Sequence, residues 1–204
     1  MGAIVRCPAV WAIVIANVVN HWGYFLYLNW MPVYFTRCLG LDLAKSAFVS
    51  FLPWTFMAVG SSLAGFFADG LIGKGVAVGK VRKYLQLVAF LVPALGLFGI
   101  SAAGDAGHLT PALATALFVA ILGVTSLGQA GFVANMSDIA PSAAGKVFGL
   151  CNTFGCLAGT ASVISTGVLL DRTGSFTLIF QMTAILYLVG AAAFFLMSRG
   201  DRQL

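Results

Sequence analysis

The sequence lacks glutamate, and it has few charged residues of any kind. Its six acidic residues are all aspartate, and charged residues make up 8% of the 204 residues, whereas hydrophobic residues make up 60%. A soluble domain carries about 25% charged residues. Six stretches contain no charged residue at all, namely residues 7–36, 46–68, 84–104, 106–137, 147–170 and 173–198. This composition excludes a water-soluble globular protein.

The uncharged stretches have the length of membrane spans. A helix rises ~1.5 Å per residue, so about 20 apolar residues cross ~30 Å of hydrocarbon. Each stretch is long enough to cross once as a helix and too short to cross twice. We therefore predict an all-α membrane protein with one transmembrane domain, residues 1–204, surrounded by membrane lipid. Its six transmembrane helices are predicted at residues 9–35, 46–68, 84–102, 111–137, 143–170 and 176–197.

The basic residues between the spans predict the orientation. If the N-terminus lies inside, the inner segments hold eight Lys and Arg residues, and the outer segments hold three, Arg37, Lys45 and Arg172. Positive charge in loops favours the cytosolic side. We expect both termini in the cytosol or in a compartment that is its topological equivalent.

Several motifs that carry chemistry are missing from the sequence. It has no HExxH and no GxxxxGK[ST] motif, and neither His21 nor His108 accompanies a nucleophile. The four cysteines form no CxxC pair, and no cluster has metal-ligand spacing. The basic residues do not gather in a patch with aromatic residues. We predict that the protein is not an enzyme, holds no metal or cofactor and does not bind nucleic acid.

The first span carries a stripe of polar residues that we take as the candidate substrate-binding site. Asn17, Asn20, His21 and Tyr24 follow the spacing i, i+3, i+4, i+7, which places them on one face of a helix. Polar groups within a membrane usually face a cavity or another helix. Two amides and an imidazole can bind an anionic solute, and the imidazole can also carry a proton. The alternative is a helix–helix contact made through amide hydrogen bonds.

Two later spans add candidates for the same site. Thr125 and Gln129 in the fourth span are four residues apart and would share a helical face. Thr125 could instead bond back to its own helix. In the fifth span Asn152 is the strongest candidate, while Gly155 and Gly159 indicate close helix packing.

A short sequence pattern that occurs twice suggests an internal repeat. The second span ends with Gly65-x-x-x-Asp69, and the fifth ends with Gly167-x-x-x-Asp171. Each span is the second of three, and the two groups of three would cross the membrane in opposite directions. Inverted repeats of three helices build each half of a major facilitator transporter. We expect a 3+3 inverted repeat.

Three segments resemble a known family. These are Val10-Trp11-Ala12, the segment 135–141 (NMSDIAP) and the segment 149–155 (GLCNTFG). They are similar to motifs of the anion transporters of the major facilitator superfamily. That family includes vesicular glutamate transporters, sialin, sodium-dependent phosphate transporters and plant plastid anion transporters. Met136 stands where the family pattern has histidine, and Ser142 stands where it has arginine.

The resemblance implies a role and the partners that it needs. It implies that the six spans are helices seven to twelve, the C-terminal half of a secondary active transporter, whose N-terminal six-helix half is missing from this sequence. Organic anions or phosphate would move by alternating access, coupled to H⁺ or Na⁺ or driven by the membrane potential. The segments Trp22-Gly23, Trp30-Met31-Pro32 and Leu52-Pro53-Trp54 look most like the plastid branch of the family, which favours a plastid membrane. The gating residues implied are Asp69, Lys74, Arg82 and Lys83, together with Asp138 at the inner end of the fourth span.

A second hypothesis concerns a different class of protein. The chain could be a non-transporting membrane subunit, or a truncated half, that packs against a partner through its glycine faces. Uptake of solute by proteoliposomes that contain only this chain would contradict that hypothesis.

Overall fold

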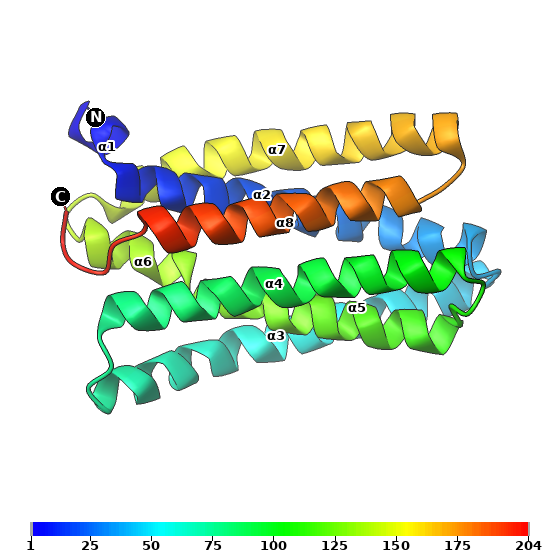
Figure 1. The fold of residues 1–204 in the computed structure, drawn as a ribbon, viewed down its shortest axis with the longest axis horizontal. Coiled ribbons are helices and arrows are strands. Elements are labelled where there is room, and N and C mark those ends of the chain that lie inside the picture. The colour runs from blue at the N-terminus through cyan, green and yellow to red at the C-terminus, as the bar shows by residue number, and fades with distance from the viewer. Residues whose placement is uncertain (1, 204) are drawn as a thin grey trace.

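The structure, a computed structural model that describes residues 2–203, is a bundle of helices with no strand among these residues (Figure 1). Six of its helices or helix pairs are long and apolar enough to cross a membrane, as the sequence predicted. The bounds are α1 (Gly2–Arg6), α2 (Pro8–Arg37), α3 (Leu43–Gly73), α4 (Val78–Asp105), α5 (Pro111–Thr125), a 3₁₀ turn η1 (Ser126–Gln129), α6 (Phe132–Ile139), α7 (Ala144–Thr173) and α8 (Thr177–Met197).

The helices pack in specific pairs. The most extensive contacts join α2 to α7, α4 to α8 and α3 to α5, followed by α4 with α5 and α2 with α8. Both ends of the chain, the α3–α4 connection and α6 lie at one end of the bundle, on the left of Figure 1. We call this the terminal end, and the opposite end the far end. The terminal end is the one that the charge count assigns to the inside.

Most helices extend beyond the spans that hydrophobicity predicted. The helix α3 continues through Asp69 to Gly73, and α4 begins at Val78, so only residues 74–77 connect them. Pro32 and Pro53 lie inside α2 and α3 without ending either helix. The ends follow local chemistry. Asp42 caps α3 by accepting a hydrogen bond from the Lys45 N–H at 2.9 Å, and this bond lowers the pKa of Asp42.

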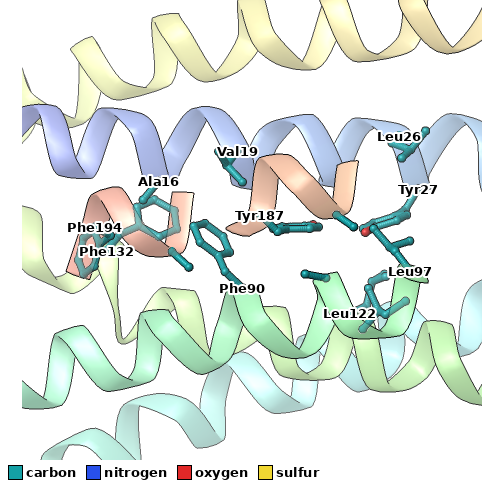
Figure 2. Close-up of a cluster of buried hydrophobic side chains, with 14 of the residues drawn as sticks. Ala16, Val19, Leu26, Tyr27, Phe90, Leu97, Leu122, Phe132, Tyr187 and Phe194 are labelled. Atoms are coloured by element: carbon teal, nitrogen blue, oxygen red, sulfur yellow. The ribbon is translucent and has the colours of Figure 1, made fainter. Parts of the chain in front are cut away.

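Aromatic side chains fill the core of the bundle. Near the far end, the ring of Tyr34 in α2 lies 5.9 Å from Phe118 in α5 and 5.0 Å from Phe180 in α8. Deeper in the bundle, Phe90 of α4 packs 5.3 Å from Tyr187 of α8 (Figure 2). These contacts join helices that are distant in the sequence and fix the surface on which α2 presents its polar stripe.

The fourth span is not one continuous helix. It consists of α5, the turn η1, a break at residues 130–131 and the short helix α6. Gly131 has no room for a side chain, because an added Cβ would lie 2.6 Å from the Gln86 side-chain oxygen. The helix of the fourth span is thus interrupted inside the bundle, and the backbone groups released at the break need partners from other helices.

Candidate functional site

The predicted polar stripe on α2 divides into two parts. Asn17 is buried, and its Nδ2 donates a hydrogen bond to the Cys151 carbonyl of α7 at 2.6 Å. His21 lies beside it, with Nδ1 3.0 Å from the Asn17 carbonyl oxygen. Asn20 is half-buried and Tyr24 is exposed, and neither makes a hydrogen bond within residues 2–203. Asn17 thus joins two helices, while Asn20 and Tyr24 keep their polar groups available.

The α2–α7 contact depends on small residues, as the sequence indicated. A Cβ added at Gly155 would lie 2.5 Å from Asn17 Nδ2 and 2.9 Å from the His21 ring, and one at Gly159 would lie 2.6 Å from Phe25. An added Cβ at Gly167 would make ordinary contact with Trp30 of α2 at 3.4 Å, whereas one at Gly145 or Gly149 would have nothing within 4 Å. One face of α7 therefore rests on α2, and the other face is open.

A small cavity lies between α2, α3, α5 and α8. Its volume is about 10 Å³, which is close to the space of one water molecule. It is lined by Asn20, Tyr24, Tyr27, Trp54, Met57, Leu122, Thr125 and Tyr187. Three of the predicted site residues, Asn20, Tyr24 and Thr125, therefore meet at one place.

Two tyrosines of this cavity were not among the predicted site residues. Tyr27 and Tyr187 are almost fully buried and lie side by side between α2 and α8 (Figure 2). Neither hydroxyl makes a hydrogen bond with acceptable geometry among the described residues. The stripe's own period points to Tyr27, which is three residues beyond Tyr24 and seven beyond Asn20. Tyr187 has only a weak signal, as the single tyrosine of its span.

Thr125 and Gln129 do not share a face, contrary to the i, i+4 expectation. Thr125 is buried and donates to the Ile121 carbonyl of its own helix at 2.7 Å, whereas Gln129 is exposed. The tighter η1 turn begins directly after Thr125, and α-helical spacing does not apply across it. Asn152 lies exposed on α7, away from the cavity.

The predicted gating residues separate in a similar way. Arg82 Nε donates to Asp138 Oδ2 at 2.7 Å, and this ion pair is largely buried, with side chains 10% and 22% exposed. Lys83 Nζ lies 5.6 Å from the centre of the Phe195 ring. Asp69 and Lys74 are exposed and make no ion pair within residues 2–203. The structure therefore brings Arg82 and Asp138 together and leaves Asp69 and Lys74 apart.

The side chains of α4 supply the partners that the break in the fourth span needs. Arg82 Nη1 donates to the Ala130 carbonyl at 3.0 Å, and Gln86 Oε1 accepts from the Phe132 N–H at 3.2 Å. Gln86 is fully buried. On the other side, Asn135 Nδ2 donates to the Arg199 carbonyl at 2.8 Å. Gln86 was not among the predicted site residues, and its only signal in the sequence is an amide inside an otherwise apolar span.

Replacing Gln86 with leucine is expected to destabilise the protein by about 1–3 kcal/mol. The Phe132 N–H would lose its acceptor in a buried place, and an unsatisfied buried donor carries a cost of that size. Thermal unfolding of the purified protein in detergent measures the change. Asn29→Leu is the control, because Asn29 is exposed and its side chain bonds only to the Phe25 carbonyl of its own helix. Equal melting temperatures for Gln86→Leu and wild type would contradict this role.

No group of three or more His, Cys or Asp side chains within residues 2–203 is arranged to hold a metal ion. The arrangement instead offers amide and hydroxyl groups on α2, an imidazole, and a buried ion pair near the terminal end. These groups can bind a solute by hydrogen bonds, and they provide no paired nucleophile and base.

The chain is similar along nearly all of its length to plant membrane transport proteins. It is 40% identical over 192 residues to Probable anion transporter 2, chloroplastic, of Oryza sativa subsp. japonica, covering 94% of this chain and 35% of the relative. It is 37% identical over 198 residues to the Ascorbate transporter, chloroplastic, of Arabidopsis thaliana, covering 97% and 35%.

The name of a third relative includes a different solute. Sodium-dependent phosphate transport protein 1, chloroplastic, of Arabidopsis thaliana is 35% identical over 196 residues, which are 96% of this chain and 37% of that protein. No protein-family profile matches the chain. The chain thus spans about a third of the length of the curated relatives that it matches.

Proposed function

We propose that this chain, which belongs to the family of the chloroplastic anion transporters, forms the C-terminal six-helix half of a secondary active transporter. The observation that carries the proposal is the match of 94–97% of the chain to proteins named as transporters of anions, ascorbate and phosphate. The transported solutes are organic anions or inorganic phosphate. Transport proceeds by alternating access and is coupled to H⁺ or Na⁺ or driven by the membrane potential. The membrane is that of a chloroplast or another plastid.

The pattern of helix contacts supports a half built from two inverted repeats. Each of the first three spans can be paired with one of the last three: α2 with α5–α6, α3 with α7, and α4 with α8. When the paired spans are exchanged, the contact between α2 and α7 becomes the contact between α5 and α3. The same exchange maps α4 with α8 onto itself and α4 with α5 onto α8 with α2. All five of the most extensive helix contacts are thus retained when the first three spans are exchanged with the last three. A 3+3 inverted repeat in a major facilitator half has this symmetry.

The stripe on α2 is the proposed solute-binding surface of this half. Asn20 and Tyr24 have polar groups without partners, and His21 adds an imidazole that can take part in hydrogen bonds. Hydrogen bonds from these groups can hold an anion, and the N-terminal half would supply further contacts across the cavity. The Arg82–Asp138 pair stabilises the terminal end in the conformation described here.

Uptake measurements test the proposal. The native polypeptide is first identified in source membranes by immunoblot against residues 198–203, then purified and reconstituted in proteoliposomes. Radiolabelled phosphate, ascorbate and glutamate serve as probes, with imposed gradients of Na⁺ or H⁺. We expect a native mass well above 21.3 kDa and uptake of at least one probe. The double variant Asn20→Ala/His21→Ala should reduce uptake at least about tenfold, since each lost polar contact contributes about 1 kcal/mol or more.

Asn29→Ala is the matched control, because Asn29 lies exposed on the same helix and bonds only within α2. Uptake by a 21.3 kDa native polypeptide alone would contradict the half-transporter proposal. Absence of uptake of all three probes by a stable, folded native protein would instead favour a non-transporting membrane subunit.

A further inference from the structure

Another cavity, which has charged residues in its lining, lies at the terminal end, apart from the small cavity between α2, α3, α5 and α8. It has a volume of about 510 Å³ and lies between the first turn of α4 and the segment that follows α8. Its lining residues are Ala77, Val78, Gly79, Lys80, Lys83, Ser198, Arg199, Gly200 and Asp201. The cavity is therefore formed by two parts of the chain more than a hundred residues apart.

Two glycines bring these parts together. An added Cβ at Gly79 would lie 3.1 Å from the Gly200 Cα, so the backbone of segment 198–203 passes directly over the first turn of α4. The segment is held further along by the hydrogen bond from the Gln203 N–H to the Ile139 carbonyl, 2.8 Å long. The wall of the cavity is thus a fixed part of the fold.

The cavity has the electrostatics of an anion site. The helix α4 is 28 residues long, it has no acidic residue in its first turn, and its N-cap, Ala77, offers no side-chain acceptor. The N–H groups of Val78 and Gly79 have no acceptor within the helix, and the helix dipole adds positive potential there. The cavity is lined by three cationic side chains against one carboxylate. That carboxylate, of Asp201, accepts a hydrogen bond from Gln203 Nε2 at 2.7 Å.

A buried hydroxyl without a partner provides independent support for a ligand. Ser198 lines the cavity and is 2% exposed, and its Oγ makes no hydrogen bond among the described residues. Buried hydroxyl groups nearly always have a partner in native proteins. An anionic oxygen inside the cavity would accept this proton as well as those of the α4 N-terminus.

We propose that this cavity binds a phosphate group, and that its natural source is the headgroup of an anionic phospholipid. Lys80, Arg199 and the first N–H groups of α4 bind the phosphate oxygens, and Ser198 donates to one of them. The neighbouring surface fits the rest of such a lipid. Tyr84, Phe195 and Leu196 are 58%, 38% and 78% exposed, and Lys83 Nζ lies over the Phe195 ring. Apolar surface next to a basic cluster at a helix end is where acyl chains and headgroups meet.

Lipid binding to the purified full chain tests the proposal. Native mass spectrometry in detergent compares phosphatidylglycerol with phosphatidylcholine at equal concentrations. We expect preferential binding of phosphatidylglycerol. The variant Lys80→Gln/Arg199→Gln should bind phosphatidylglycerol at least about tenfold more weakly than wild type, and Ser198→Ala should bind it severalfold more weakly. The control is Arg6→Gln/Lys146→Gln, which removes the same charge from two exposed residues outside the cavity and should bind as wild type does.

Inorganic phosphate, tested by its effect on thermal stability against chloride at equal ionic strength, distinguishes the two sources of the ligand. Stabilisation that is lost in Lys80→Gln/Arg199→Gln, without a preference for phosphatidylglycerol, would retain the phosphate site and overturn the lipid as its source. Equal loss of lipid binding in the control variant would overturn the site, because general surface charge would then explain the binding. No binding of either probe to the folded wild-type chain would also overturn it.

Discussion

Replacing Arg82 with glutamine is expected to destabilise the terminal end of the bundle by about 3 kcal/mol. The change leaves the half-buried Asp138 carboxylate without its cation, and breaking a buried pair from one side carries a cost of about 3–5 kcal/mol. Asp138 is 22% exposed, so water reduces the cost towards the lower value. The Ala130 carbonyl at the break of the fourth span loses its partner as well.

The double variant Arg82→Gln/Asp138→Asn separates charge from packing. It removes both charges at once, and two neutral amides can still form a hydrogen bond, so we expect it to recover part of the lost stability. Asp69→Asn is the control, since Asp69 is exposed and makes no ion pair within the described residues. Thermal unfolding in detergent gives the three values. If Arg82→Gln melts no lower than Asp69→Asn, the ion pair does not stabilise this end of the protein.

Replacing Gly155 with leucine is expected to separate α7 from α2 and to lower stability by about 3 kcal/mol. Even the first carbon of the new side chain would lie 2.5 Å from Asn17 Nδ2 and 2.9 Å from the His21 ring, so both residues must move. Overpacking a well-filled contact costs about 1–3 kcal/mol, and here the Asn17–Cys151 hydrogen bond is lost in addition. Solute uptake should fall with stability, because the stripe on α2 loses its support.

Gly149→Leu provides the matched control for this experiment. Gly149 lies six residues earlier on the same helix, and an added Cβ there meets nothing within 4 Å. Leucine forms helices better than glycine by up to ~1 kcal/mol, so this variant should be as stable as wild type or slightly more stable. Thermal unfolding of both variants in detergent checks the prediction. If Gly149→Leu proves as harmful as Gly155→Leu, both faces of α7 are packed, and the contact with α2 is not what makes Gly155 necessary.

The six spans were predictable because a charged side chain within lipid is costly, and charged residues are therefore absent along the length of each span. Charge-free stretches of 21–32 residues leave little other choice of structure, and the structure has six helices of suitable length. The contact through Gly155 was also predictable, since a small residue four positions from another is a local pattern. Both features depend on neighbours in the sequence alone.

The break in the fourth span could not be predicted in the same way. Residues 106–137 form the longest uncharged stretch of the sequence, and nothing in the hydrophobicity of this stretch marks a break in the helix. The break is possible because Arg82 and Gln86 satisfy its backbone groups from more than forty residues away. For the same reason Gln129 was placed on the wrong face. Partners that come from distant segments leave no periodic signal.

The hydrogen bonds between α6 and segment 198–203 also constrain how the protein is made. Asn135 and Ile139 belong to the fourth span, but their partners, the Arg199 carbonyl and the Gln203 N–H, follow the sixth. During synthesis the ribosome delivers α6 to the membrane well before these partners exist. Until translation has passed residue 203, the terminal end of the fourth span therefore has only the partners that precede it, namely Arg82, Gln86 and the helices α2 and α4 against which it packs. A stalled or shortened product would expose this helix to the quality-control proteases of the membrane.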